Sequence, residues 1–103
     1  MTIQYNTSNI GEEEVRLQET INELVENTLG RFEEKITRLE VHLSDENSHK
    51  EGQNDKRCLV EARIAGLQPI AVTSNANSFE EASKIAIGKL KNKLETVLGK
   101  LNN

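Results

Sequence analysis

The spacing of apolar residues changes twice along this chain, and these changes limit the folds that it can adopt. From residue 11 to residue 35, apolar side chains recur every three or four residues, which predicts a helix with one buried stripe. The stripe consists of Leu17, Ile21, Leu24, Val25, Leu29 and Phe32. Between residues 36 and 76 three separate runs have a period of two, which predicts strands, and from residue 78 the spacing returns to three or four. The sequence therefore predicts several strands that lie between two helices along the chain.

Three runs of period two define these strands. Their apolar positions are Leu39, Val41 and Leu43 in the first run, Cys58, Val60, Ala62 and Ile64 in the second, and Ile70 and Val72 in the third. Only residues 66–68 separate the second run from the third, so we expect those two strands to form an antiparallel hairpin. Pro69 then belongs at the start of its strand or on a sheet edge, because proline has no N–H to donate.

Both predicted helices carry start signals. Asn9 with Glu12 marks the first helix, and Ser78 with Glu81 forms a capping box before the second. The apolar stripe of the second helix consists of Phe79, Ala82, Ala86, Leu90, Leu94, Val97 and Leu101. The second helix is therefore expected to extend almost to the C-terminus.

The predicted fold is an α+β sandwich of order β-α-β-β-β-α, with two helices packed on one face of a four-stranded sheet. Ile3 and Tyr5, at strand spacing, supply the additional edge strand at the N-terminus. The 103 residues suit one domain that spans residues 1–103. Residues 44–56 contain no large apolar side chain, so we expect an exposed loop there.

No pattern in the chain predicts catalysis or a metal site. His42 and His49 lie near several acids and Cys58, but no two His or Cys residues have zinc-ligand spacing, and the loop lacks the calcium-binding pattern. We interpret the single cysteine, Cys58, as a small buried core residue. We therefore expect no enzyme, no cofactor and no small-molecule substrate. Without a run of 18 apolar residues or a signal peptide, we expect no membrane partner and a cytoplasmic location.

Charge is unevenly distributed along the chain. Residues 1–35 carry eight acids and three bases, whereas residues 78–103 carry three acids and five bases, although the whole chain has a net charge of −4. Five basic residues are therefore our candidates for contacts with RNA phosphates: Lys89, Lys93 and Lys100 on one face of the last helix, and Arg31 and Lys35 at the end of the first. Lysines near a helix C-terminus also complement the helix dipole and raise solubility, which is the structural alternative.

Two local strings resemble one family, the ribosome hibernation promoting factors and ribosome-associated inhibitors, also called sigma-54 modulation or ribosomal S30 proteins. In that family an acidic amphipathic helix ends in Lys-Leu-Glu and is followed by Ile-x-x-x-x-Val-x-Leu; the corresponding residues here are 31–33 and 36–43. Its last helix carries Asp-Lys-Leu-x-x-Gln-Leu, which corresponds to Gly88–Leu94. The resemblance spans Thr2 to Leu101 and supports the same fold.

The resemblance implies a translation inhibitor or hibernation factor that acts under stress or in stationary phase. Such proteins bind the small ribosomal subunit, at ribosomal RNA near the decoding centre, and block access of tRNA and mRNA. Arg31 and Lys89 match basic positions of the family, and Lys93 lies close to one. Three neutral residues, Asn27, Asn92 and Thr96, stand where the family usually has basic residues, which predicts weaker binding to the ribosome. Because the sequence ends at Asn103, it resembles the short type that lacks a C-terminal dimerisation domain.

Two alternatives remain open at the level of sequence. The α-β-β-β-α portion has the element order of the double-stranded RNA-binding domain, although the last helix begins with the acidic string of residues 78–81. The other alternative is a protein-interaction or regulatory module that keeps the fold but has lost the RNA-binding surface. That module would use the acidic first helix or the sheet face with Arg38, Arg57 and Arg63.

Overall fold

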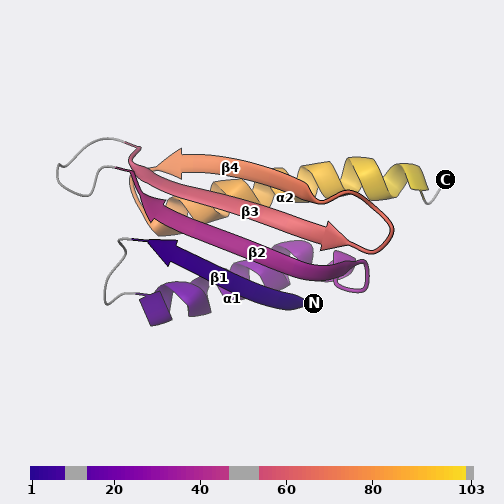
Figure 1. The fold of residues 1–103 in the computed structure, drawn as a ribbon, viewed down its shortest axis with the longest axis horizontal. Coiled ribbons are helices and arrows are strands. Elements are labelled where there is room, and N and C mark those ends of the chain that lie inside the picture. The colour runs from indigo at the N-terminus through magenta and orange to yellow at the C-terminus, as the bar shows by residue number, and fades with distance from the viewer. Residues whose placement is uncertain (9–13, 47–53, 102–103) are drawn as a thin grey trace.

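The computed structural model describes residues 1–8, 14–46 and 54–101. For residues 100 and 101 it describes the backbone only. The elements are β1 (Thr2–Ser8), α1 (Glu14–Leu29), the 3₁₀ turn η2 (Gly30–Phe32), β2 (Ile36–Asp45), β3 (Lys56–Ile64), β4 (Ile70–Ala76) and α2 (Phe79–Leu101). This order confirms the predicted β-α-β-β-β-α sandwich (Figure 1).

The four strands form one mixed sheet in the order β1-β2-β3-β4. β1 runs parallel to β2 because α1 returns the chain across the sheet face between them, whereas the other neighbours are antiparallel. The predicted hairpin is confirmed: β3 pairs with β4, and Val60 lies opposite Val72. Its turn contains Gly66 at φ +80°, a backbone conformation that favours glycine. Pro69 directly precedes the edge strand β4, where no ladder N–H is lost.

Both helices cover the same face of the sheet (Figure 1). α2 packs on β3 and β4 and contacts α1 along its other side. α1 is tied to β1 by polar contacts: the Thr7 hydroxyl donates to Glu14 Oε1 at 2.8 Å, and the Tyr5 hydroxyl lies 3.2 Å from the backbone oxygen of Gln18. The opposite face of the sheet carries no helix in the described part of the chain.

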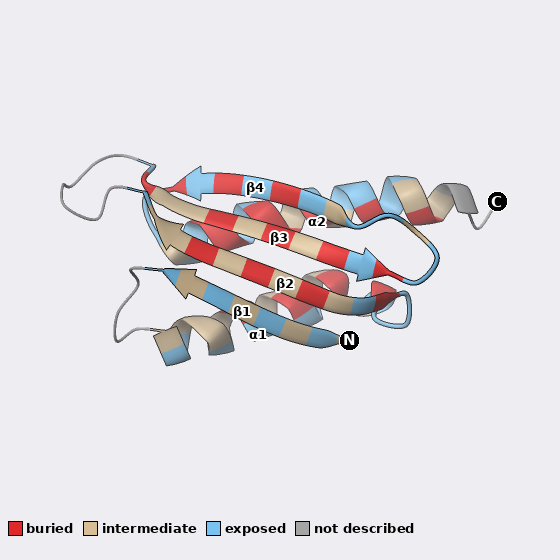
Figure 2. Ribbon diagram, in the orientation of Figure 1, coloured by how far each residue is buried: buried red, intermediate tan, exposed pale blue. Residues whose placement is uncertain are grey.

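The core lies between the sheet and the helices. From Leu39 to Leu43 in β2 and from Cys58 to Ile64 in β3 every second side chain is buried, as the period of two predicts, and Figure 2 shows this alternation along the strands. The strand residues of the core include Leu39, Val41, Leu43, Cys58, Val60, Ala62, Ile64 and Val72, and the helix residues include Ile21, Val25, Leu29, Ala82, Ala86, Leu90 and Leu94. All are aliphatic or small, so the core is built with almost no aromatic side chain.

The ends of several elements differ from the sequence-based expectation. α1 ends at Leu29 rather than near residue 35, because Gly30 is a poor helix former and the chain tightens into η2. The predicted cap residues Asn9 and Glu12 lie outside the described residues. At α2 the capping box forms in part, since the Glu81 N–H donates to Ser78 Oγ at 3.1 Å. Near the end of α2 the buried residue is Leu98, with Val97 half-buried, and the side chain of Leu101 is not described.

The loop predicted at about 44–56 is shorter in the structure, because strands β2 and β3 extend into it at its two ends. β2 continues to Asp45 and β3 begins at Lys56, and these two residues lie opposite each other in the ladder. Lys56 Nζ contacts Asp45 Oδ2 at 2.9 Å, and the Glu46 N–H donates to the Asp55 backbone oxygen at 2.8 Å. Residues 47–53 of this loop lie outside the described residues.

Candidate nucleic-acid interface

The lysines of α2 project from a helix that is fixed on two sides. Its buried stripe packs on β3 and β4, and one flank contacts α1. Four lysines, Lys84, Lys89, Lys91 and Lys93, occur between residues 82 and 94 without an acid among them. The middle of α2 is therefore a basic element in an acidic molecule, and its packing determines where each ammonium group points.

Lys89 is held against the edge of the sheet. Its Nζ donates a hydrogen bond to the backbone oxygen of Thr73 on β4 at 2.9 Å. β4 is an outer strand of the sheet, so one side of its backbone lacks a neighbouring strand. An ammonium group has three donors, and this bond uses one of them. Lys89 is exposed and can therefore present its remaining donors to a phosphate without leaving Thr73.

Lys93 lies one helical turn beyond Lys89 and projects from the same flank of α2. It is exposed, and within the described residues no hydrogen bond or ion pair involves its side chain. Lys100 belongs to the last turn of α2, but its side chain lies outside the described part of the structure. The structure thus brings Lys89 and Lys93 together beside the β4 edge.

Arg31 lies in η2 and contacts the opposite flank of α2. Its Nη2 is 2.6 Å from Glu95 Oε2, and its guanidinium lies 4.7 Å from the centroid of the Phe32 ring. The side chains of Arg31 and Glu95 are 60% and 41% exposed, so water weakens this ion pair, which contributes at most about 1 kcal/mol to stability. The positive charge of Arg31 is therefore shared with a carboxylate.

Four of the five predicted RNA-contacting residues fall into two groups, and the side chain of Lys100 lies outside the described structure. Glu95 follows Lys89 by six residues, which places the two side chains roughly 120° apart around the axis of α2. Lys89 points toward β4, whereas Glu95 points toward the end of α1, where Arg31 meets it. Arg31 and Lys35 thus form a second group, separated from Lys89 and Lys93 by the width of α2.

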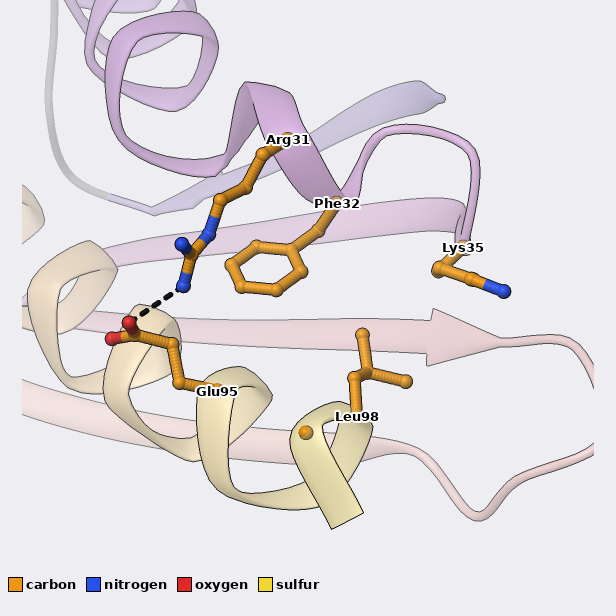
Figure 3. Close-up of a pocket in the computed structure, with 6 residues that line it drawn as sticks. Arg31, Phe32, Lys35, Glu95 and Leu98 are labelled. Atoms are coloured by element: carbon orange, nitrogen blue, oxygen red, sulfur yellow. Dashed lines mark hydrogen bonds and ion pairs between the residues drawn. The ribbon is translucent and has the colours of Figure 1, made fainter. Parts of the chain in front are cut away.

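The second group surrounds an open groove of about 420 Å³, which we call the η2 groove. Its lining residues are Arg31, Phe32, Lys35, Glu95, Leu98 and Gly99. Figure 3 shows the Arg31–Glu95 ion pair at one end, Lys35 beyond the other end, and Phe32 and Leu98 between them. Sequence reasoning did not find this groove, because Arg31 and Glu95 are 64 residues apart and no local pattern connects them.

Acidic side chains surround the basic ones on both faces of the molecule. On α1, Glu19, Glu23 and Glu26 are all exposed. On the open sheet face, Arg38 Nη2 is 2.8 Å from Glu40, and Arg63 Nε lies 3.2 Å from Glu40 and 3.1 Å from Glu61. Arg57 Nε is 3.6 Å from Glu46. The arginines of the sheet face are therefore paired, and α2 carries the strongest basic surface among the described elements.

Cys58 is a core residue, as the sequence predicts. It is fully buried between the sheet and α2, and burial raises its pKa from 9.0 to about 11, so it is a neutral thiol near neutral pH. Within the described residues no group of three or more His, Cys, Asp or Glu side chains is arranged to hold a metal ion. No helix in that part of the chain is long and apolar enough to cross a membrane.

Comparison with known proteins finds one family whose model matches most of the chain. The model of a family described as "Sigma 54 modulation protein / S30EA ribosomal protein" matches residues 9–102. Among curated protein sequences, no significant match is found.

Two solved structures share the fold. The Thermus thermophilus Protein Y N-terminal domain has a TM-score of 0.72 and 15% identity, covering 93% of this chain and 98% of its own. A ribosomal subunit interface protein from Coxiella burnetii has a TM-score of 0.68 and 16% identity, covering 96% of this chain and 99% of its own. At such low identity the likeness concerns the fold and not the side chains of the site.

Proposed function

This chain belongs to the Sigma 54 modulation protein / S30EA ribosomal protein family, and on that basis we propose that it is a ribosome-associated translation inhibitor of the hibernation-factor type. It binds the small ribosomal subunit, at ribosomal RNA near the decoding centre, under stress or in stationary phase, and its site of action is the cytoplasm. Its role is binding rather than catalysis. The Coxiella burnetii protein with the same fold is a ribosomal subunit interface protein, which supports the ribosome as the partner.

The basic flank of α2 is the observation that supports RNA as the ligand. Lys89 and Lys93 lie one turn apart beside β4, and the segment from residue 82 to residue 94 contains no acid. Lysine contacts with phosphates release condensed counterions, so even a small cluster gives sequence-independent affinity. The exposed acids Glu19, Glu23 and Glu26 of α1 repel RNA, so that surface is unsuited to contact with the nucleic acid.

Co-sedimentation with purified small ribosomal subunits at low and moderate salt tests this function. The key variant is Lys89→Gln/Lys93→Gln, which lowers the net charge by two. The matched control is Arg16→Glu, which lowers the net charge equally at an exposed position on α1. We expect the wild type and the control to sediment with the subunit at low salt, and the double variant to remain largely at the top of the gradient.

Two results would contradict the proposal. Absence of wild-type binding at low salt would show that the fold serves another partner. Equal loss of binding in the double variant and in Arg16→Glu would show that net charge, rather than the α2 flank, determines the interaction.

One alternative function has a structural observation in its favour. The exposed acids Glu19, Glu23 and Glu26 give α1 a negative outer surface, which suits a basic protein partner better than RNA. A pull-down from cell extract treated with ribonuclease separates the two functions. Capture of one basic, non-ribosomal protein in stoichiometric amount, lost in Glu23→Gln/Glu26→Gln, would favour the protein-interaction module.

A further inference from the structure

The η2 groove combines an apolar floor with a charged rim. Phe32 and Leu98 are 8% and 5% exposed, so they belong to the core and offer only a narrow apolar surface to the groove. Gly99 leaves space on the α2 side, since a Cβ added there would meet no atom within 4 Å. A volume of about 420 Å³ falls in the usual range for small-ligand pockets. The groove therefore suits a flat, partly apolar group rather than an ion alone.

Arg31 provides a planar surface beside this floor. Its guanidinium lies over the Phe32 ring, 4.7 Å from the centroid, and its Nη2 is 2.6 Å from Glu95 Oε2. These two contacts orient the guanidinium, while 60% of the side chain remains exposed. Unpaired nucleobases commonly stack on such arginine planes and on aromatic rings in RNA-binding proteins.

Glu95 indicates which feature of a base is recognised. A carboxylate repels phosphates, so a site for the RNA backbone alone would not place one at the rim. A carboxylate does accept hydrogen bonds from the edge of a base, and Arg31 occupies only Oε2 of Glu95. Guanine presents two adjacent donors on its Watson–Crick edge, the N1–H and the N2 amino group, which can bond to Oε1 and to the second lone pair of Oε2.

Lys35 supplies a cation at the far end of the groove from the ion pair (Figure 3). It lies in the turn between η2 and β2, and its N–H donates to the Phe32 backbone oxygen at 2.9 Å, which fixes the turn. Its side chain is exposed, and the ammonium group points away from Phe32. This location suits the phosphate attached to a nucleoside whose base lies between Arg31 and Leu98.

We propose that the η2 groove binds one unstacked nucleobase of the RNA, with guanine preferred. Arg31 stacks on the base, Glu95 accepts hydrogen bonds from its N1–H and N2 amino group, and Lys35 contacts its phosphate. This inference rests on the proposed function, because it names the feature of the RNA that one part of the surface reads. It assigns readout of a base to the end of α1, whereas the α2 flank binds phosphates only.

Nucleoside monophosphates test the groove without a ribosome. The isotope-labelled protein is titrated with guanosine, inosine, adenosine and uridine monophosphates while its amide ¹H–¹⁵N signals are followed. We expect shifts concentrated at the amides of residues 30–35 and 95–99 for guanosine monophosphate. Inosine monophosphate differs from it only by the missing N2 amino group, and we expect it to bind about fivefold more weakly.

Two variants of equal charge change make the test specific. Glu95→Gln removes the carboxylate and should bring the affinities for guanosine and inosine monophosphates within about twofold of each other. Glu26→Gln, at an exposed position of α1, should keep the full guanosine preference. A thermal unfolding curve for each variant checks that the fold is retained, which the high exposure of both glutamates leads us to expect.

The outcomes separate this inference from the proposed function. Equal shifts with all four nucleotides, or shifts centred on Lys89 and Lys93, would overturn base recognition even if the protein co-sediments with ribosomal subunits. A guanosine preference that depends on Glu95 would support the groove even if no co-sedimentation occurs, in which case only the ribosomal partner would be wrong.

Discussion

At the scale of single residues, burial determines the chemistry of Cys58. The thiol has no exposed surface, and burial raises its pKa from an ordinary value of 9.0 to about 11. A group whose pKa is raised on folding contributes stability that is complete below the unfolded pKa and is lost as the pH rises through the folded pKa. The contribution of Cys58 is therefore present at pH 7 and declines between about pH 9 and pH 11.

We predict that Cys58→Ala reduces the alkaline loss of stability. From pH 8 to pH 11, the wild type should lose about 2 to 3 kcal/mol more free energy of unfolding than the variant, because only the wild type has a buried thiol to ionise. Urea unfolding curves at closely spaced pH values measure the difference. Parallel pH profiles for the two proteins would show that the thiol ionises in the folded state without cost.

The hydrogen bond of Lys89 allows its functional and structural roles to be separated. Lys89 Nζ contacts the Thr73 backbone oxygen, but both groups lie at the surface, where water can replace the bond. We predict that Lys89→Gln lowers the free energy of unfolding by less than about 1 kcal/mol while it clearly weakens binding to the small ribosomal subunit. Chemical denaturation and co-sedimentation of the same preparation measure both. A large stability loss with unchanged binding would assign Lys89 to the protection of the sheet edge.

At the scale of elements, the sequence predicts what depends on periodicity and does not predict a local change of helix geometry. Leu39, Val41 and Leu43 alternate in the sequence and are all buried in the fold, because a strand on one core has a side-chain period of two. The early end of α1 at Leu29 was missed, because the apolar stripe continues to Phe32 through a turn of different geometry. Helical spacing alone does not distinguish these two geometries over one turn.

Two glycines test how backbone conformation stabilises these elements. Gly66 has φ +80° in the β3–β4 turn, where an alanine is strained, whereas Gly88 lies within α2 and an added Cβ there would meet no atom within 4 Å. We predict that Gly66→Ala destabilises the protein by about 1 kcal/mol and that Gly88→Ala stabilises it by about 0.5–1 kcal/mol. Denaturant unfolding of the pair measures both signs. A stabilising Gly66→Ala or a destabilising Gly88→Ala would contradict the backbone conformations described for these elements.

At the scale of the whole molecule, the fold and the charge pattern carry different information. The sandwich is shared with the Thermus thermophilus Protein Y N-terminal domain at only 15% identity, so the fold does not depend on the identity of most side chains. The geometry of the candidate site is less predictable, because it depends on the side of α2 from which each side chain projects. Lys89 and Lys93 could be grouped from their spacing, whereas the pairing of Arg31 with Glu95 depends on how α1 and α2 pack together.

The separation of basic residues across the molecule leads to a prediction about salt dependence. Lys89, Lys93 and Lys35 are exposed cations that no acid neutralises among the described residues, whereas Arg31 is paired with Glu95. Each phosphate contact adds about 0.7 to 0.9 to the slope of log affinity against log salt concentration, so three contacts give a slope of about −2 to −3. Lys93→Gln should reduce the magnitude of the slope by just under one unit, and Arg16→Gln, on α1, should leave it unchanged. The affinity for small subunits, measured across a series of salt concentrations, gives this slope. A wild-type slope steeper than about −5 would mean that cations other than these three dominate the contact with RNA.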